Sequence, residues 1–259
     1  MDMDDGLDDL RADVADLGTS IRELLRWESE LSGTGIPDIP GISGLSDRQL
    51  PENAAPAPLT AAKDPVTAAK DPAHHLRLLS EDAAKCTACA LHAGRTKSVF
   101  GRGNAQAELL FVGEGPNVNE DEQGVPFIGR AGELLDRMIA AMGFGPEEIY
   151  ICNVVKCRPP ENRTPQVEEA QACSSFLTQQ IDVIQPKVIV ALGRCAAENL
   201  GLATPGEDGW RGRWGEVRGI PSLSTYHPAY LLRSPEQKKP VWSDLKQVVA
   251  RLGRSLPRR

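Results

Sequence analysis

The sequence lacks the features of membrane-spanning and secreted proteins. No run of 18 or more apolar residues occurs among its 259 residues, which excludes a hydrophobic transmembrane helix. The first ten residues, MDMDDGLDDL, are acidic, whereas a secretory signal begins with a basic segment. Six cysteines are too few for a disulfide scaffold in a chain of this length. We therefore expect a protein of the reducing cytoplasm, where cysteines more often bind metal than form disulfides.

The chain also lacks the overall positive charge that is typical of nucleic-acid-binding proteins, since its net charge is −7. The negative charge is concentrated at one end. Residues 1–80 contain 15 acidic and 7 basic residues, whereas the remainder contains 21 acidic and 22 basic ones. A local basic face on the remainder is therefore compatible with the composition.

The N-terminal segment divides into two parts. Residues 1–32 predict an amphipathic helix, because apolar residues repeat at alternating steps of three and four over about four heptads. Such a helix either packs on its own domain or forms a coiled coil with a protein partner or a second copy. Residues 33–75 are rich in Pro and Ala and contain the tandem repeat TAAKDPVTAAKDP, which predicts a flexible, disordered linker.

From residue 76 onward the pattern is that of an α/β domain, which we expect to extend to residue 259. Short apolar runs alternate with helical periodicity, which favours a parallel sheet with helices on both faces. The expected strands lie at 108–113, 148–155, 187–193 and 220–227, and the expected helices at 131–143, 165–184, 194–201 and 241–253. Ligands of such sheets bind beyond the carboxyl ends of the strands, so the loops that follow each apolar run are the candidate site.

The six cysteines fall into two groups. Cys152 lies in an apolar strand and Cys195 at the start of a helix, so both are expected to be ordinary buried residues. Cys86 and Cys89 form a Cys-x-x-Cys pair, and Cys157 and Cys173 form a wider one. From spacing alone the second group is compatible with zinc, with an iron–sulfur cluster, with a redox pair or with buried structural cysteines.

Five segments occur in a fixed order and carry a resemblance. They are CTACALHAGRTKSVFGRG (86–103), VGEGPNVNEDEQGVPFIGRAGELLDRM (112–138), NVVKCRPPENRTP (153–165), EEAQAC (168–173) and HPAYLLR (227–233). Together they resemble the family 4 uracil-DNA glycosylases, the iron–sulfur branch of that superfamily, over about residues 78–253. The resemblance implies a three-layer α/β/α fold with a short central parallel sheet. It also implies a [4Fe–4S] cluster on Cys86, Cys89, Cys157 and Cys173.

The implied reaction is hydrolysis of the glycosidic bond of deoxyuridine in DNA, the first step of base excision repair, which places the protein at the nucleoid. The base must be flipped out of the duplex, and charge develops on sugar and uracil as the bond breaks. The resemblance and the residue types together assign these tasks to four uracil-binding residues, three catalytic candidates and four DNA contacts. They are Gly115, Glu120, Phe127 and Asn153 for uracil; Glu114, His227 and Asn162 for catalysis; and Arg130, Leu231, Leu232 and Arg233 for DNA.

Each assignment has a physical basis and a structural alternative. Phe127 supplies a stacking face unless it is a core residue, and Asn153 offers a donor and an acceptor to the uracil edge unless it only ends a strand. A neutral imidazole of His227 suits the departing anion at O2, whereas a lone histidine is more often structural. Glu114 and Asn162 are candidates for positioning water, and Glu120 for excluding the methyl group of thymine.

The remaining assignments concern DNA and one departure from the family. Leu231 or Leu232 suits a wedge between bases, while the exposed arginines are either phosphate contacts or plain surface charge. The family usually reads Gly-Glu-Gly-Pro-Gly, but this chain has Asn117 at the last position. We expect the loop to tolerate it, since Asn accepts a positive φ better than other side chains do.

Two other classes of function remain open at this stage. One is a non-catalytic zinc or cluster module that binds DNA or protein, and the other is a nucleotide-binding protein. The second rests on fold analogy alone, because GEGP is neither a dinucleotide-binding nor a Walker motif.

Overall fold

The structure, a computed structural model, describes residues 71–257. The predicted helix at 1–32 and most of the predicted linker lie outside these residues, so both stay predictions, as does a partner for the helix. Residues 72–75, expected in the linker, belong to helix α3 (Pro72–Lys85). This helix begins early because the Asp71 side chain accepts a hydrogen bond from the Ala73 N–H at 3.0 Å and proline occupies the first turn.

The centre of the domain is a mixed six-stranded sheet in the order β1-β3-β2-β4-β6-β5. Its four inner strands are parallel, and the two edge strands pair antiparallel with their neighbours. The strands are β1 (Arg102–Gly103), β2 (Leu109–Gly113), β3 (Ile149–Asn153), β4 (Val188–Leu192), β5 (Trp214–Val217) and β6 (Ile220–Thr225). The parallel inner sheet confirms the predicted fold class.

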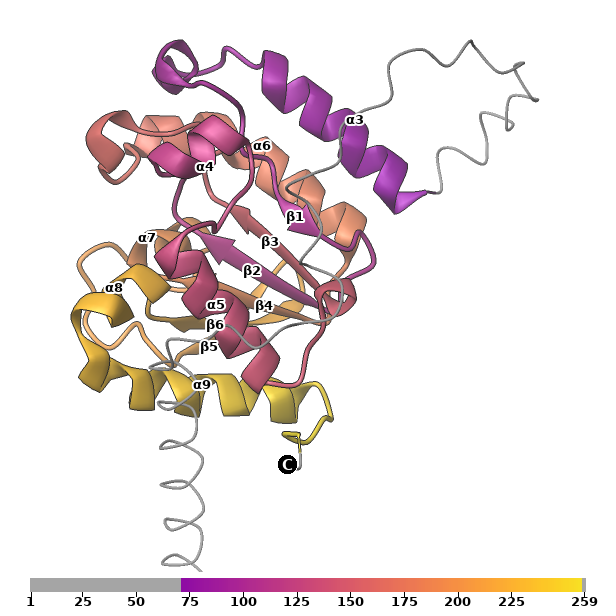
Figure 1. Cartoon of the computed structure of the whole chain (residues 1–259), viewed down its shortest axis with the longest axis vertical. Coiled ribbons are helices and arrows are strands. Elements are labelled where there is room, and N and C mark those ends of the chain that lie inside the picture. The colour runs from indigo at the N-terminus through magenta and orange to yellow at the C-terminus, as the bar shows by residue number, and fades with distance from the viewer. Residues whose placement is uncertain (1–70, 258–259) are drawn as a thin grey trace, which may run out of the picture. The chain divides into compact units, whose positions relative to one another are not determined.

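Helices cover both faces of the sheet, which gives three layers (Figure 1). They are α3, α4 (Val118–Gln123), α5 (Arg130–Ala141), α6 (Val167–Ile184), α7 (Arg194–Asn199), α8 (Pro228–Arg233) and α9 (Lys238–Arg251). Helices α3 and α6 lie against one face, where they share a core with alternate residues of the inner strands, among them Leu110, Cys152 and Ile189. Helices α5 and α9 cover the opposite face (Figure 1).

The inner strands are fully buried, as expected for apolar runs enclosed between two layers of helices. Strands β3 and β4 lie on opposite sides of β2, so the connections after β2 and β4 diverge. Such a switch point opens a crevice beyond the carboxyl ends of the strands. Within the described range no helix has the length and hydropathy to cross a bilayer.

Candidate functional site: the carboxyl edge of the sheet and a four-cysteine cavity

Asn153 is the last residue of β3, and its amide is buried without a partner. The residue is 1% exposed, and among residues 71–257 neither Oδ1 nor Nδ2 has a hydrogen-bond partner. Gly113, its neighbour in β2, has no side chain to fill this space. A Cβ there would lie 2.4 Å from Asn153 Oδ1 and 2.6 Å from Phe127 Cζ. The amide and the phenyl ring therefore approach each other over the end of β2.

Phe127 stacks against His227 at this edge. Their ring centroids are 5.3 Å apart and the ring planes differ by 29°. Phe127 is 4% exposed and has a φ of 54°, a conformation that is uncommon for an aromatic residue. Phe127 lies in a loop and not in a helix or strand, as the sequence indicated.

Three residues, Arg102, Gly132 and Glu120, hold the Phe127 loop in this conformation. Arg102 Nε donates to the Pro126 carbonyl at 3.1 Å, and its Nη2 donates to the Phe127 carbonyl at 3.4 Å. A Cβ at Gly132 in α5 would lie 1.9 Å from that same carbonyl oxygen, so only glycine fits there. The strained backbone is thus fixed by its surroundings, as is common at functional sites.

Glu120 is the third residue that holds the Phe127 loop. Its buried carboxylate accepts hydrogen bonds from the backbone N–H groups of Asn117, Phe127 and Ile128. Burial raises the pKa of Glu120 above its usual range, while these hydrogen bonds oppose the rise. The carboxylate is therefore engaged in holding the Phe127 loop, and a role at the uracil C5 position stays a prediction.

The expectation that Asn117 has to adopt a positive φ is wrong. Its φ is −93°, so the position does not require a left-handed residue. Asn117 instead caps α4: its side chain accepts from the Glu120 N–H at 3.1 Å, and the Glu120 carboxylate accepts from the Asn117 N–H at 3.1 Å. This reciprocal pair is a capping box. Asn117, the residue that differs from the family pattern, is thereby bonded to Glu120, which also holds the Phe127 loop.

His227 follows β6 and is half-buried at the start of α8. Its Nδ1 accepts the Ala229 N–H at 3.1 Å, so the helix cap requires a lone pair on that nitrogen. Burial, and after it the charge of Arg233, lowers the pKa of His227 to about 4. The imidazole is therefore neutral at physiological pH and carries its proton on Nε2, which leaves one N–H free to donate.

The loop after β2 carries Glu114 and Gly115. Burial raises the pKa of Glu114 above its ordinary value of 4.5, although a hydrogen bond with the Thr164 side chain opposes the rise. A Cβ on Gly115 would lie 2.8 Å from Val155 Cγ2, so the loops beyond β2 and β3 are closely packed. The Val155 N–H donates to the Glu114 carbonyl at 3.2 Å, which extends the strand pairing into these loops.

The other predicted residues occupy different environments. Asn162 is exposed, and its Oδ1 accepts from Arg158 Nε at 2.8 Å. Arg130 and Arg233 are exposed, as a contact with phosphate requires. Leu231 has no exposed surface, so of the two predicted wedge residues it is the less accessible one, and its contact with DNA stays a prediction. Leu232 is partly exposed and remains the candidate wedge.

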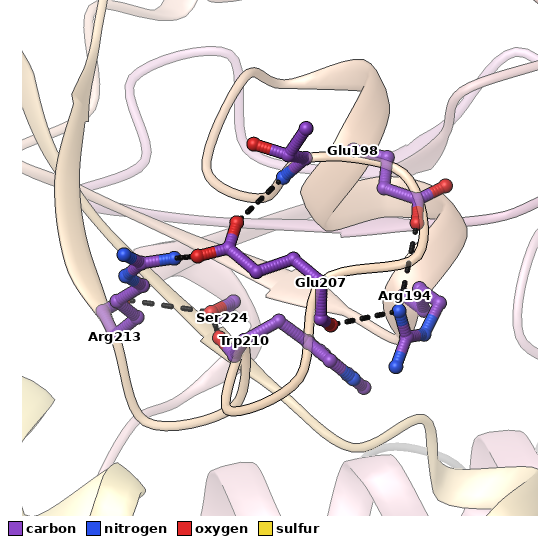
Figure 2. Close-up of polar contacts among 7 residues, drawn as sticks. Arg194, Glu198, Glu207, Trp210, Arg213 and Ser224 are labelled. Carbon is purple, nitrogen blue, oxygen red and sulfur yellow. Dashed lines mark hydrogen bonds and ion pairs between the residues drawn. The ribbon is translucent and has the colours of Figure 1, made fainter.

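The sequence analysis did not anticipate the polar contacts of the loop between α7 and β5 (Figure 2). The Glu207 carboxylate accepts from the Thr204 N–H at 3.0 Å and from Arg213, and its carbonyl accepts from Arg194 at 2.9 Å. The Ser224 hydroxyl of β6 donates to the Trp210 carbonyl. Polar loop residues have no periodicity, so only the abundance of glycine and charge marked this segment as a loop.

This loop reaches the site through aromatic rings. Trp210 meets Tyr226, the residue before His227, with ring centroids 5.7 Å apart. Arg211 donates to the buried Asp244 of α9 at 2.6 Å, and the Thr225 hydroxyl donates to the same oxygen at 2.6 Å. The end of β6 is thereby fixed to α9 next to the histidine.

The four cysteines of the second group line one cavity. Cys86 and Cys89 follow α3, Cys157 follows β3, and Cys173 lies in α6, and the cavity wall is completed by Ala83, Ala88, His92, Lys156, Ala172 and Phe176. Cys152 and Cys195 are buried elsewhere, as expected. In the described part of the chain no three His, Cys, Asp or Glu side chains are grouped so as to hold a single metal ion.

Hydrogen-bond donors surround these sulfurs. Arg95 Nη1 lies 3.2 Å from Cys157 Sγ, the Lys156 N–H lies 3.4 Å from Cys173 Sγ, and the Ala88 N–H lies 3.5 Å from Cys86 Sγ. Burial raises the pKa of the Cys157 and Cys173 thiols, and the hydrogen bonds oppose the rise. Four thiols lining one cavity, three of them with a donor at the sulfur, fit a group that binds thiolates.

Comparison with known proteins gives the family of this α/β/α domain. Residues 100–246 match the family model of the uracil DNA glycosylase superfamily. A type-4 uracil-DNA glycosylase of Thermotoga maritima is 46% identical over 182 residues, which cover 66% of this chain and 92% of the relative. A type-4 uracil-DNA glycosylase of Archaeoglobus fulgidus is 41% identical over 182 residues, which cover 66% and 90%. The chain therefore belongs to the uracil-DNA glycosylase superfamily.

Proposed function

We propose that this chain is a DNA-repair glycosylase that hydrolyses the bond between uracil and deoxyribose in DNA and leaves an abasic site. The observation that carries the proposal is the unpartnered amide of Asn153, buried near the Phe127 ring that stacks on His227, in a member of this superfamily. A buried amide without partners costs about 1–3 kcal/mol, so its retention is understandable if a ligand satisfies it.

Recognition of the flipped base follows from these groups. The Asn153 amide can donate to uracil O4 through Nδ2 and accept from N3–H through Oδ1, which matches uracil and not cytosine. Phe127 offers its ring face for stacking, and Gly115 lets the backbone approach the base. Leu232, Arg130 and Arg233 are the proposed contacts with the DNA strand.

Bond cleavage leaves negative charge on uracil and positive charge on the sugar. The Nε2–H of His227 is the donor proposed for O2, and a fixed donor to a developing oxyanion is worth on the order of 10²–10³-fold in rate. The Glu114 carboxylate is the group that we propose orients water or stabilises the sugar cation. Asn162, exposed and bound to Arg158, is a weaker candidate for positioning water.

Cys86, Cys89, Cys157 and Cys173 are proposed to hold a [4Fe–4S] cluster. The donor set fits it, because four thiols from three separate segments converge on one cavity. When bound, the cluster would link the start of the domain to the loop after Asn153. Its role would be structural, because hydrolysis transfers no electrons. The residues that act on uracil are those of the sheet edge.

The test of the proposed function is uracil release from a labelled oligonucleotide by the full chain as purified, with its iron content measured in parallel. We expect uracil-dependent cleavage after alkaline treatment and none with thymine or cytosine at the same position. Release of no uracil by iron-loaded protein would refute the proposal and favour a non-catalytic DNA-binding module.

The pH dependence of the reaction should identify Glu114. Because burial raises its pKa above 4.5, the carboxylate is lost as the pH falls through that raised value, and kcat/KM should fall with it. His227 remains neutral down to about pH 4, so it should contribute no limb at higher pH. In Glu114→Gln the acid limb should disappear, whereas in His227→Gln a slower reaction should keep it. An unchanged acid limb in Glu114→Gln would exclude this role for Glu114.

A further inference from the structure

Lys156 lies between the two halves of the site described above. It is the third residue after Asn153 and directly precedes Cys157, and it is 1% exposed. Its Nζ donates to the Asn153 carbonyl at 2.6 Å and to Gln180 Oε1 at 2.6 Å, and it lies 5.7 Å from the Phe100 ring centroid. The Lys156 side chain is thus bonded to the backbone of Asn153, the last residue of β3, whose amide has no hydrogen-bond partner among residues 71–257.

The backbone of Lys156 faces the cysteine cavity. Its N–H donates to Cys173 Sγ at 3.4 Å, its carbonyl accepts from the Val99 N–H at 2.7 Å, and the residue lines the cavity wall. Gln180, also fully buried, donates through Nε2 to the Phe100 carbonyl at 2.9 Å, so the Gln180 amide is held in place. One rigid network therefore connects the sheet edge to the cysteines.

The charge of Lys156 needs a counterpart. A buried ammonium is costly unless negative charge compensates it, and both acceptors of Nζ, an amide and a carbonyl, are neutral. Lys156 lines the same cavity as the four cysteines, so a negatively charged group bound there would lie beside it. A cluster held by four thiolates carries net negative charge, and nearby positive charge changes its reduction potential.

We propose that Lys156 is a positioning residue with two tasks: its ammonium group offsets the charge of a cluster in the four-cysteine cavity, and it fixes the Asn153 carbonyl so that the amide meets uracil correctly. The first task depends only on the cluster, whereas the second rests on the proposed function. Together they make the cluster loop and the base-reading strand one unit.

Lys156→Met tests both tasks, because methionine keeps the length and loses the charge. We expect iron-loaded K156M to have a more negative reduction potential than the wild type in a redox titration followed by visible absorption. We also expect its kcat for uracil release to fall about 10-fold with little change in KM, the size typical of removing a group behind a site residue. Lys187→Met is the matched control, since Lys187 is exposed and paired with Glu108, and it should change neither quantity.

A second variant separates the effect of the Lys156 charge on the cluster from its bond to the Asn153 carbonyl. It also tests the proposal if K156M does not fold. Gln180→Glu keeps an acceptor for Nζ and the bond from Nζ to the Asn153 carbonyl, neutralises the charge beside it, and loses only the donor to the Phe100 carbonyl. It should lower the potential while kcat stays within about 3-fold of the wild type. Wild-type potential and kcat in K156M, or a wild-type potential in iron-loaded Q180E, would overturn the inference. Failure of the proposed function is distinct, because the wild type itself would then release no uracil while the potentials still report on Lys156.

Discussion

Replacing Asn153 by leucine should remove uracil release and at the same time stabilise the folded protein. Leucine has nearly the shape of asparagine but no polar atoms. Both amide atoms of Asn153 are buried, and in the described part of the chain both lack partners, so the substitution removes a penalty of about 1–3 kcal/mol. If Asn153 reads the base as proposed, the same change leaves uracil O4 and N3–H unpaired. We expect kcat/KM to fall by on the order of 10³-fold or more.

Two comparisons sharpen this prediction. Asn153→Asp keeps the shape but cannot donate to O4, so it should lose comparable activity, yet it buries a carboxylate and should destabilise the fold. Asn199→Leu removes an exposed amide that donates to the Cys195 carbonyl one turn earlier at 2.9 Å, so it should change stability by less than about 0.5 kcal/mol and keep the activity. Urea unfolding and uracil release decide the outcome. If N153L unfolded at lower urea than the wild type, the amide would be satisfied in the free protein and the argument for a missing ligand would fail.

The sequence predicted the strands of the inner sheet well, because burial on both faces requires continuous apolar runs. The run at 108–113 becomes β2 and the run at 187–193 becomes β4, each within one residue at either end. The edge strands were not anticipated. Strand β1 has only two residues and β5 is only partly buried, so neither shows the apolar pattern that marks an inner strand.

The site was predictable as a set of loops, but its contacts were not. Parallel strands end at one edge, so the residues after them had to lie near one another. The stacking of Phe127 on His227 depends on a positive φ, on the Glu120 carboxylate and on a glycine in α5, and no periodic signal reports such contacts. The same holds for Arg95, which donates to Cys157 Sγ, and for Lys156, whose N–H donates to Cys173 Sγ, because each bond joins residues distant in the chain.

Removing one cavity cysteine pair should abolish cluster binding and lower the stability of the domain substantially. In the double variant Cys86→Ala, Cys89→Ala, iron content and brown colour should be lost. Roughly 70 residues separate Cys89 from Cys157, and releasing a cross-link over a loop of that length costs about 4 kcal/mol. For a domain of this size that energy corresponds to a fall in Tm of about 10 °C. Iron analysis, absorbance near 400 nm and a thermal melt measure these effects.

The matched control is the double variant Cys152→Ala, Cys195→Ala, which removes the two cysteines that do not line the cavity. It should keep the iron and the colour, and lose only the stability due to two small buried side chains, about 1 kcal/mol each. If both double variants lost iron equally, the cavity would not be the binding site. If the first variant lost its iron but melted with the wild type, the cluster would not fix α3 to the loop after Asn153. That loop and α3 meet at the cavity through Ala83, Cys86 and Cys157, which is why we expect a group bound there to act as a cross-link between them.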